Sequence, residues 1–148
     1  RLQLFEPVEF ILTHFPGRVT FTPVPDTVTV HAPCSSIKMG VDRQLVRLAG
    51  MCAREVIVPD EVGCCGWAGD RGFTVPERNA SALKMLRPGL PERVKSGYST
   101  SRTCEIGLSL HRGIIYRSIV YLVDEATCPV DQRPNVSRPT SSPVAADR

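Results

Sequence analysis

Apolar residues recur along the first half of this chain with two spacings, one typical of helices and one of strands. Residues 7–15 carry apolar side chains three and four positions apart, and Pro7 suits the first turn of a helix. Residues 27–32 (TVTVHA) form a β-rich run, and residues 41–53 return to helical spacing. The apolar run at 55–59 (EVIVP) is typical of a short buried strand.

The second half of the chain continues this succession. A helix is expected to open at Pro76 and to be closed by Pro88 and Pro91. A weak strand near 94–99 leads into a helix from Arg102, and residues 114–126 are expected to form a last, buried helix. This alternation predicts an α/β fold with a small parallel sheet and right-handed crossover helices, in which the first three strands are parallel neighbours.

Two regions of different composition divide the chain. Residues 1–128 contain all the predicted elements, and with 42% hydrophobic residues overall the 148-residue chain can bury a core without disulfides. Residues 129–148 hold four prolines and no leucine, isoleucine or aromatic residue, so we expect a flexible tail there. Because helical sequence follows almost directly after Arg1, we expect a piece of a longer protein.

The charge pattern excludes some partners. The net charge is +3, from 18 basic and 15 acidic residues that are spread along the chain. No basic run or basic stripe with interleaved aromatic residues is present, which argues against nucleic acid as a partner. No apolar stretch approaches the length of a membrane span.

Six cysteines are a high number for a cytosolic chain of this length. A secreted disulfide scaffold would be shorter and poorer in aliphatic residues, so we favour reduced, metal-binding or redox-active thiols. Four of the six come just after a predicted strand: Cys34, Cys64, Cys65 and Cys104. Because the carboxyl ends of parallel strands meet at one edge of a sheet, these four should converge there. Cys52 is expected to be a core thiol on a helix, and Cys128 a boundary thiol.

Converging thiolates suit either an iron–sulfur cluster or zinc. The chain has no C-x-x-C pair of the kind that structural zinc sites use, and adjacent thiolates fit two irons of one cluster more easily than one zinc ion. A thiol redox site and inert core cysteines remain alternatives. His31 is either a ligand, a hydrogen-bond donor to a ligand, or a satisfied core histidine. Arg71 and Arg102 either offset the charge of a cluster or form ordinary salt bridges.

Three segments carry a family resemblance: HAPCSSIKMG, CCGWAGDRGF and GYSTSRTCEIGLS. Together they resemble the CCG cysteine-rich domain of heterodisulfide reductases and of the iron–sulfur subunit of glycolate oxidase. The likeness is greatest to the C-terminal region of FAD-linked oxidases of the D-lactate and D-2-hydroxyglutarate dehydrogenase type. It covers about residues 5–128, and Cys-Cys-Gly followed by Ala-Gly-Asp-Arg-Gly-Phe is a specific pattern.

The resemblance implies a set of ligands. Cys34 resembles the first cysteine of the family, and Cys64 and Cys65 resemble its central pair. Cys104 resembles the first cysteine of a closing C-x-x-C motif whose second position is occupied here by Gly107. Heterodisulfide reductases use five cysteines for a non-cubane cluster, so the four present here imply an ordinary 4Fe–4S cluster or an altered site, with zinc as an alternative occupant.

The resemblance also implies a function. Such a domain passes electrons from flavin to an acceptor within an FAD-linked D-2-hydroxy-acid dehydrogenase, whose FAD and ferredoxin-like domains lie upstream in the same polypeptide. The alternatives are a zinc- or thiol-based structural module and a thiol/disulfide redox site. A cytoplasmic location is expected, with peripheral attachment to the inner face of the cell membrane as a variant. The chain lacks a G-x-G-x-x-G fingerprint, so we expect it alone to bind no FAD and to have no dehydrogenase activity.

Overall fold

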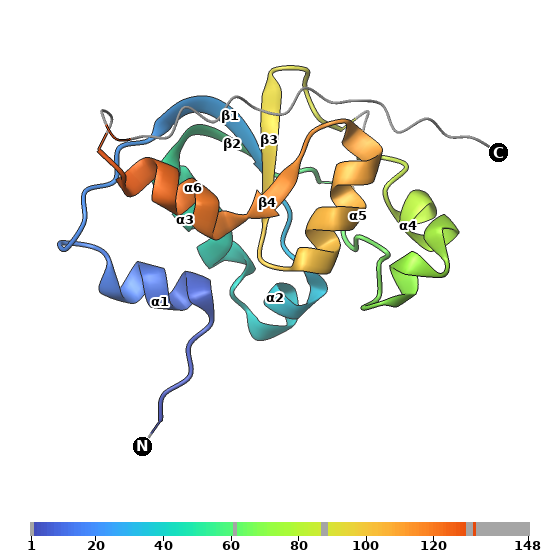
Figure 1. Ribbon diagram of the computed structural model, residues 1–148, viewed down its shortest axis with the longest axis horizontal. Helices are drawn as coiled ribbons and strands as arrows, with labels where there is room; N and C mark the ends of the chain where they lie inside the picture. The colour runs from blue at the N-terminus through green and yellow to red at the C-terminus, as the bar shows by residue number, and fades with distance from the viewer. Residues whose placement is uncertain (1, 61, 87–88, 130–131, 133–148) are drawn as a thin grey trace.

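Four parallel strands form one sheet, whose order is β2-β1-β3-β4 (Figure 1). The structure is a computed structural model that describes residues 2–60, 62–86, 89–129 and 132, without the side chain of Arg112. The strands are β1 (Val24–Val30), β2 (Ala53–Ile57), β3 (Val94–Ser99) and β4 (Tyr116–Ser118). Strand β1 lies at the centre, where Val28 is level with Val56 on one side and with Ser96 on the other. The predicted α/β fold and its three parallel neighbours are confirmed.

Helices connect and flank these strands. They are α1 (Pro7–His14), α2 (Cys34–Met39), α3 (Asp42–Cys52), α4 (Pro76–Ala82), α5 (Arg102–Arg112) and α6 (Ile119–Thr127), with a short 3-10 turn η1 (Arg71–Phe73) before α4. Proline occupies the first turn of α1 and of α4, where its missing N–H costs no hydrogen bond. Helices α2 and α5 end at Gly40 and Gly113, which adopt the left-handed conformation that glycine accepts readily.

The predicted starting residue of the last helix is wrong. Residues 114–126 were expected to be helical throughout, but Tyr116–Ser118 forms β4, which pairs in parallel with β3. The helix begins only at Ile119, because the Ser118 hydroxyl accepts a hydrogen bond from the backbone N–H of Val120 and so caps it. The expected flexible tail, apart from Pro129 and Gln132, lies outside the described residues.

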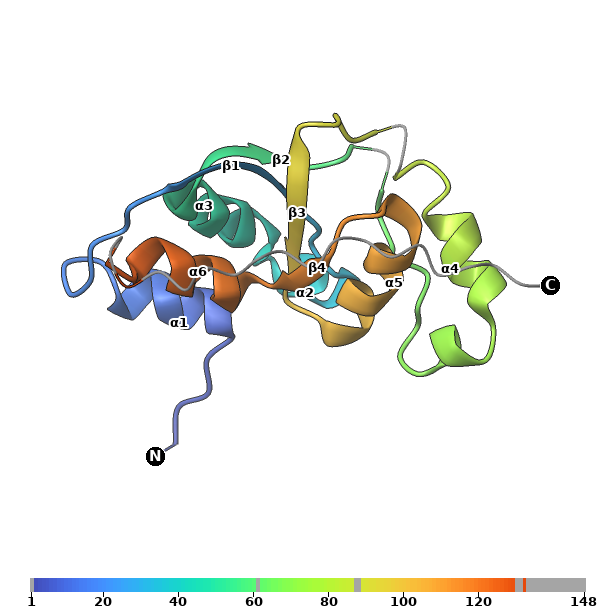
Figure 2. The ribbon, with the colours of Figure 1, turned by 45° about the horizontal axis from the view of Figure 1, so that its top comes forward.

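Two hydrophobic clusters lie on opposite faces of the sheet. Figures 1 and 2 show α1, α3 and α6 gathered on one side and α4 and α5 on the other. The first cluster joins α1, α3 and α6 to Val28 and Val30 of β1. The second contains Cys65, Trp67 and Cys104. Because side chains alternate along a strand, residues that follow Val30 by one position point toward the second cluster.

Candidate metal centre

Three strand-to-helix connections carry the four predicted cysteines. Cys34 is the first residue of α2, which follows β1. Cys64 and Cys65 lie in the loop after β2, and Cys104 lies in the first turn of α5, which follows β3. Since these strands are parallel neighbours, all three connections leave the same edge of the sheet.

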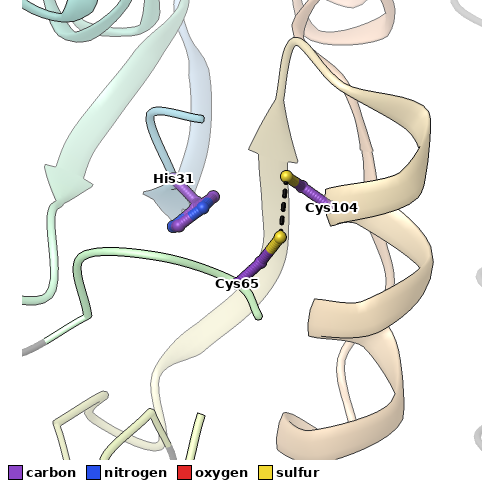
Figure 3. A group of neighbouring side chains, drawn as sticks. All are labelled: His31, Cys65 and Cys104. Carbon is purple, nitrogen blue, oxygen red and sulfur yellow. Dashed lines mark hydrogen bonds between the residues drawn. The ribbon is translucent and has the colours of Figure 1, made fainter. Parts of the chain in front are cut away.

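Two of the cysteines make direct contact in the interior. The Sγ atoms of Cys65 and Cys104 lie 2.9 Å apart, and both side chains are buried. A ring nitrogen of His31 completes a compact group in which the three ligand atoms lie within 4.8 Å of one another. Figure 3 shows His31 at the end of β1, beside the two sulfurs that approach each other from the loop and from α5. We call these three residues the inner group.

The backbone of His31 is fixed on both sides. Its N–H donates to the carbonyl of Tyr98 over 2.9 Å, and its carbonyl accepts a hydrogen bond of 2.9 Å from the Ser99 hydroxyl. The ring is only 3% exposed, and its Nε2 has no hydrogen-bond partner among the described residues. His31 therefore places an unsatisfied donor or acceptor atom beside two sulfur atoms.

The loop that carries Cys65 depends on Gly66 and Asn79. Gly66 has a φ of +69°, and a Cβ there would lie 2.6 Å from the carbonyl oxygen of Arg78. The buried side-chain amide of Asn79 donates to the carbonyl of Cys65 over 2.6 Å, and its oxygen lies 2.6 Å from Nε2 of His111 on α5. Asn79 thus ties the Cys65 loop to the helix that carries Cys104. His111 itself is half-buried.

The other two predicted cysteines form an outer pair. Cys34 and Cys64 are both exposed, and a hydrogen bond to Cys64 is the main reason why the pKa of the Cys34 thiol is raised. The charge of Cys65 raises it further, so the outer pair lies within electrostatic reach of the inner group. The Cys34 segment is also held to the connection before α5, because the hydroxyls of Ser36 and Thr100 lie 3.0 Å apart.

The ionisation of one buried thiol affects the pKa of the other. A hydrogen bond with Cys104 is the main cause that lowers the pKa of Cys65, and the nearby imidazole of His31 lowers it as well, against the opposing effect of burial. The same hydrogen bond and burial raise the pKa of Cys104. The first proton therefore leaves Cys65, whose thiolate is stabilised by the Cys104 thiol.

The donor set fits a metal that accepts thiolates. Sulfur and imidazole nitrogen are the ligands of zinc and of iron–sulfur centres. Two sulfurs that bind one tetrahedral metal ion through bonds of about 2.3 Å lie about 3.8 Å apart, so the inner group needs only a small expansion to hold a single ion. The unsatisfied Nε2 of His31 supports the same conclusion, because a metal would give this buried atom a partner.

Gly107, at the position where the sequence resemblance implies a further cysteine, is closely packed. A Cβ at this position would lie 2.5 Å from Nδ2 of Asn79 and 2.7 Å from Cε3 of Trp67. Trp67 is itself buried and packs edge-on against Phe73, with ring centroids 5.1 Å apart. A fifth thiolate at this position would require both Trp67 and Asn79 to move.

The remaining candidates lie elsewhere or form ordinary contacts. Cys52 is buried in the first cluster, on the other face of the sheet, and burial raises the pKa of its thiol to about 12. Cys128 follows the end of α6 and is half-buried. Arg102 forms a salt bridge of 3.1 Å with Glu105 one turn along α5.

Sequence reasoning gave His31 only as an alternative ligand. The adjacency of His31 to the Pro33-Cys34 pair and its place one residue beyond the apolar Val30 were the available indications. The assignment of Cys34, Cys64, Cys65 and Cys104 as metal ligands stays a prediction.

No helix in the described part of the chain combines the length and the apolar character that a membrane span requires. Comparisons with protein-family models, with curated proteins and with solved structures found no match for this chain.

Proposed function

We propose that this chain is an iron–sulfur-binding electron-transfer domain that serves an FAD-linked D-2-hydroxy-acid dehydrogenase of the D-lactate type. The observation that carries the proposal is the contact between Cys65 and Cys104, whose sulfurs lie 2.9 Å apart although 38 residues separate them in sequence. The CCG-like motif around Cys64 and Cys65 supports the class of enzyme. The four residues that would hold the cluster are Cys34, Cys64, Cys65 and Cys104.

The chain itself prepares and protects this site. The Cys104 thiol and the His31 imidazole favour the thiolate form of Cys65, which is the form that binds metal. Burial of Cys65 and Cys104 in the second cluster keeps water from their side of the site. A bound iron–sulfur cluster would supply one-electron transfer there.

The exposure of the outer pair indicates which side of the site faces solvent. Cys34 and Cys64 are exposed, whereas Cys65 and Cys104 are buried, so the site opens to solvent on the side of the outer pair. We infer that the electron donor and the acceptor approach from this side. In this proposal the donor is the reduced flavin, and the FAD and ferredoxin-like domains belong to the same polypeptide.

A structural zinc site is the second candidate. The inner group brings one nitrogen and two sulfurs within 4.8 Å, and one exposed cysteine would complete the four ligands of a tetrahedral zinc ion. The lowered pKa of Cys65 and its contact with Cys104 also suit a third candidate, a thiol/disulfide redox site.

Metal analysis of protein made without oxygen separates these candidates. We expect iron and acid-labile sulfide together, with visible thiolate-to-iron absorption that disappears on reduction. The variant Cys65→Ser should lose the iron, whereas Cys52→Ser should keep it, because Cys52 lies on the other face of the sheet. Stoichiometric zinc without sulfide would favour the structural module. Metal-free protein that cycles between a Cys65–Cys104 disulfide and two thiols would favour the redox site.

A further inference from the structure

His31 presents a buried nitrogen atom for which the protein supplies no hydrogen bond. The side chain is 3% exposed, and its Nε2 has no hydrogen-bond partner within the described ranges. Buried polar atoms in folded proteins are almost always satisfied, so an orphaned ring nitrogen points to a missing partner. A ring nitrogen of His31 lies within 4.8 Å of the sulfurs of Cys65 and Cys104.

The ring has little freedom to find a partner elsewhere. Hydrogen bonds to Tyr98 and from Ser99 fix the backbone of His31 on both sides. Side-chain alternation directs its ring to the face opposite Val30, toward the second cluster, where the two cysteines are buried. The ring is close enough to the Cys65 sulfur to lower the pKa of that thiol by hydrogen bonding and by its charge.

We propose that the imidazole of His31 is itself a ligand of the metal held by Cys65 and Cys104, so that the site is a mixed histidine–cysteine centre. This inference rests on the proposed metal site, but it holds for iron and for zinc alike. On binding, the two thiols give up their protons to solvent, while the neutral imidazole contributes the lone pair of one nitrogen.

No side chain fits at Gly107, because a Cβ there would lie 2.5 Å from Nδ2 of Asn79 and 2.7 Å from Cε3 of Trp67. His31 approaches Cys65 and Cys104 from the end of β1. A neutral imidazole ligand carries no negative charge, so an iron centre that includes it should have a higher reduction potential than an all-thiolate centre with the same number of ligands, as histidine ligation gives in Rieske centres.

Cobalt(II) provides the test, because its absorption reports the number of sulfur and nitrogen ligands without any enzyme assay. The reduced, metal-free chain of 148 residues is titrated with Co²⁺ in the absence of oxygen. We compare the wild type with His31→Ala and His31→Cys. The matched control is His14→Ala, a histidine on α1 that contacts Phe5 and Phe10, outside the inner group.

The wild type and His14→Ala should show the same ligand-field bands and thiolate-to-cobalt absorption. His31→Ala should bind Co²⁺ at least tenfold more weakly, since even the loss of an outer hydrogen-bond partner of a ligand costs about 10- to 100-fold. Added imidazole should restore the wild-type bands in His31→Ala. His31→Cys should bind Co²⁺ with bands shifted toward those of an all-sulfur site.

The possible failures are distinguishable. If the wild type binds neither cobalt nor iron, the proposed function falls and this inference falls with it. If the wild type binds cobalt and both His31 variants give its unchanged spectrum and affinity, the inference is overturned while the metal site stands. If the variants do not fold, the ring ¹⁵N resonances of the wild type decide: one of the two His31 nitrogens must shift strongly on addition of Cd²⁺, and unchanged resonances would refute the proposal.

Discussion

Replacing Gly66 by alanine should destabilise the loop that carries Cys65, for two reasons that the structure separates. The φ of +69° at Gly66 lies in the left-handed region, which costs an ordinary residue about 1–2 kcal/mol. In addition, a Cβ at this position would lie 2.6 Å from the carbonyl oxygen of Arg78 and 2.7 Å from the Cβ of Ala82. Such overpacking typically costs a further 1–3 kcal/mol or so. We therefore expect a total loss of about 2–5 kcal/mol, a large part of the stability of a typical domain.

Gly69 in the same loop is a matched control. Its φ of +73° is nearly the same, but a Cβ at Gly69 would meet nothing within 4 Å. Gly69→Ala should therefore lose only the conformational share, about 1–2 kcal/mol. Urea denaturation of the metal-free chain, followed by circular dichroism, measures both changes in the free energy of unfolding.

The difference between the two variants isolates the steric contribution at Gly66. If Gly66→Ala and Gly69→Ala lose the same stability, the close approach of the loop to α4 does not hold in solution. If Gly66→Ala also keeps the metal affinity of the wild type, the loop conformation does not control the position of Cys65. Either result would refute the reasoning that connects this glycine to the site.

Three further predictions follow from other contacts. Cys52 should resist thiol reagents in the folded chain while the exposed cysteines react at once, because Cys52 is buried and the pKa of its thiol is raised to about 12. Mass spectrometry after brief alkylation measures this difference. Early labelling of Cys52 would contradict its placement. Asn79→Ala should lower the free energy of unfolding by about 1–3 kcal/mol, since it leaves the Cys65 carbonyl and the His111 ring without this partner; an unchanged urea midpoint would count against it. Hydrogen bonds from Arg93 and Thr27 lower the pKa of the Glu55 carboxyl group to about 2. The contribution of Glu55 to stability is therefore fully present above its ordinary pKa of about 4.3, and it is lost as the pH falls through about 2. In Arg93→Ala, carbon-detected NMR titration should find this pKa raised toward 4.3, and an unchanged value would show that the ion pair does not form.

Much of the fold was determined by local pattern. Helical spacing at 7–15 and 41–53 corresponds to α1 and α3, and the buried-type run at 55–59 corresponds to β2 within two residues. Period and proline placement are properties of the local chain, so the sequence displays them directly. Strand β4 was missed because it is only three residues long and leads directly into α6, and its strand character comes from pairing with β3 rather than from its own pattern.

The convergence of cysteines at one edge could be expected from topology, but their division could not. The rule that parallel strands present their carboxyl ends at one edge needs only the order of elements. Which thiols are buried depends on the exact path of the backbone, since even the adjacent Cys64 and Cys65 differ. Cys65 and Cys104 are buried, whereas Cys34 and Cys64 are exposed. The role of His31 as a candidate ligand likewise follows only from the folded structure. Its orphaned Nε2 exists because residues far apart in sequence enclose it without offering a hydrogen bond, and no pattern of neighbouring residues records that enclosure.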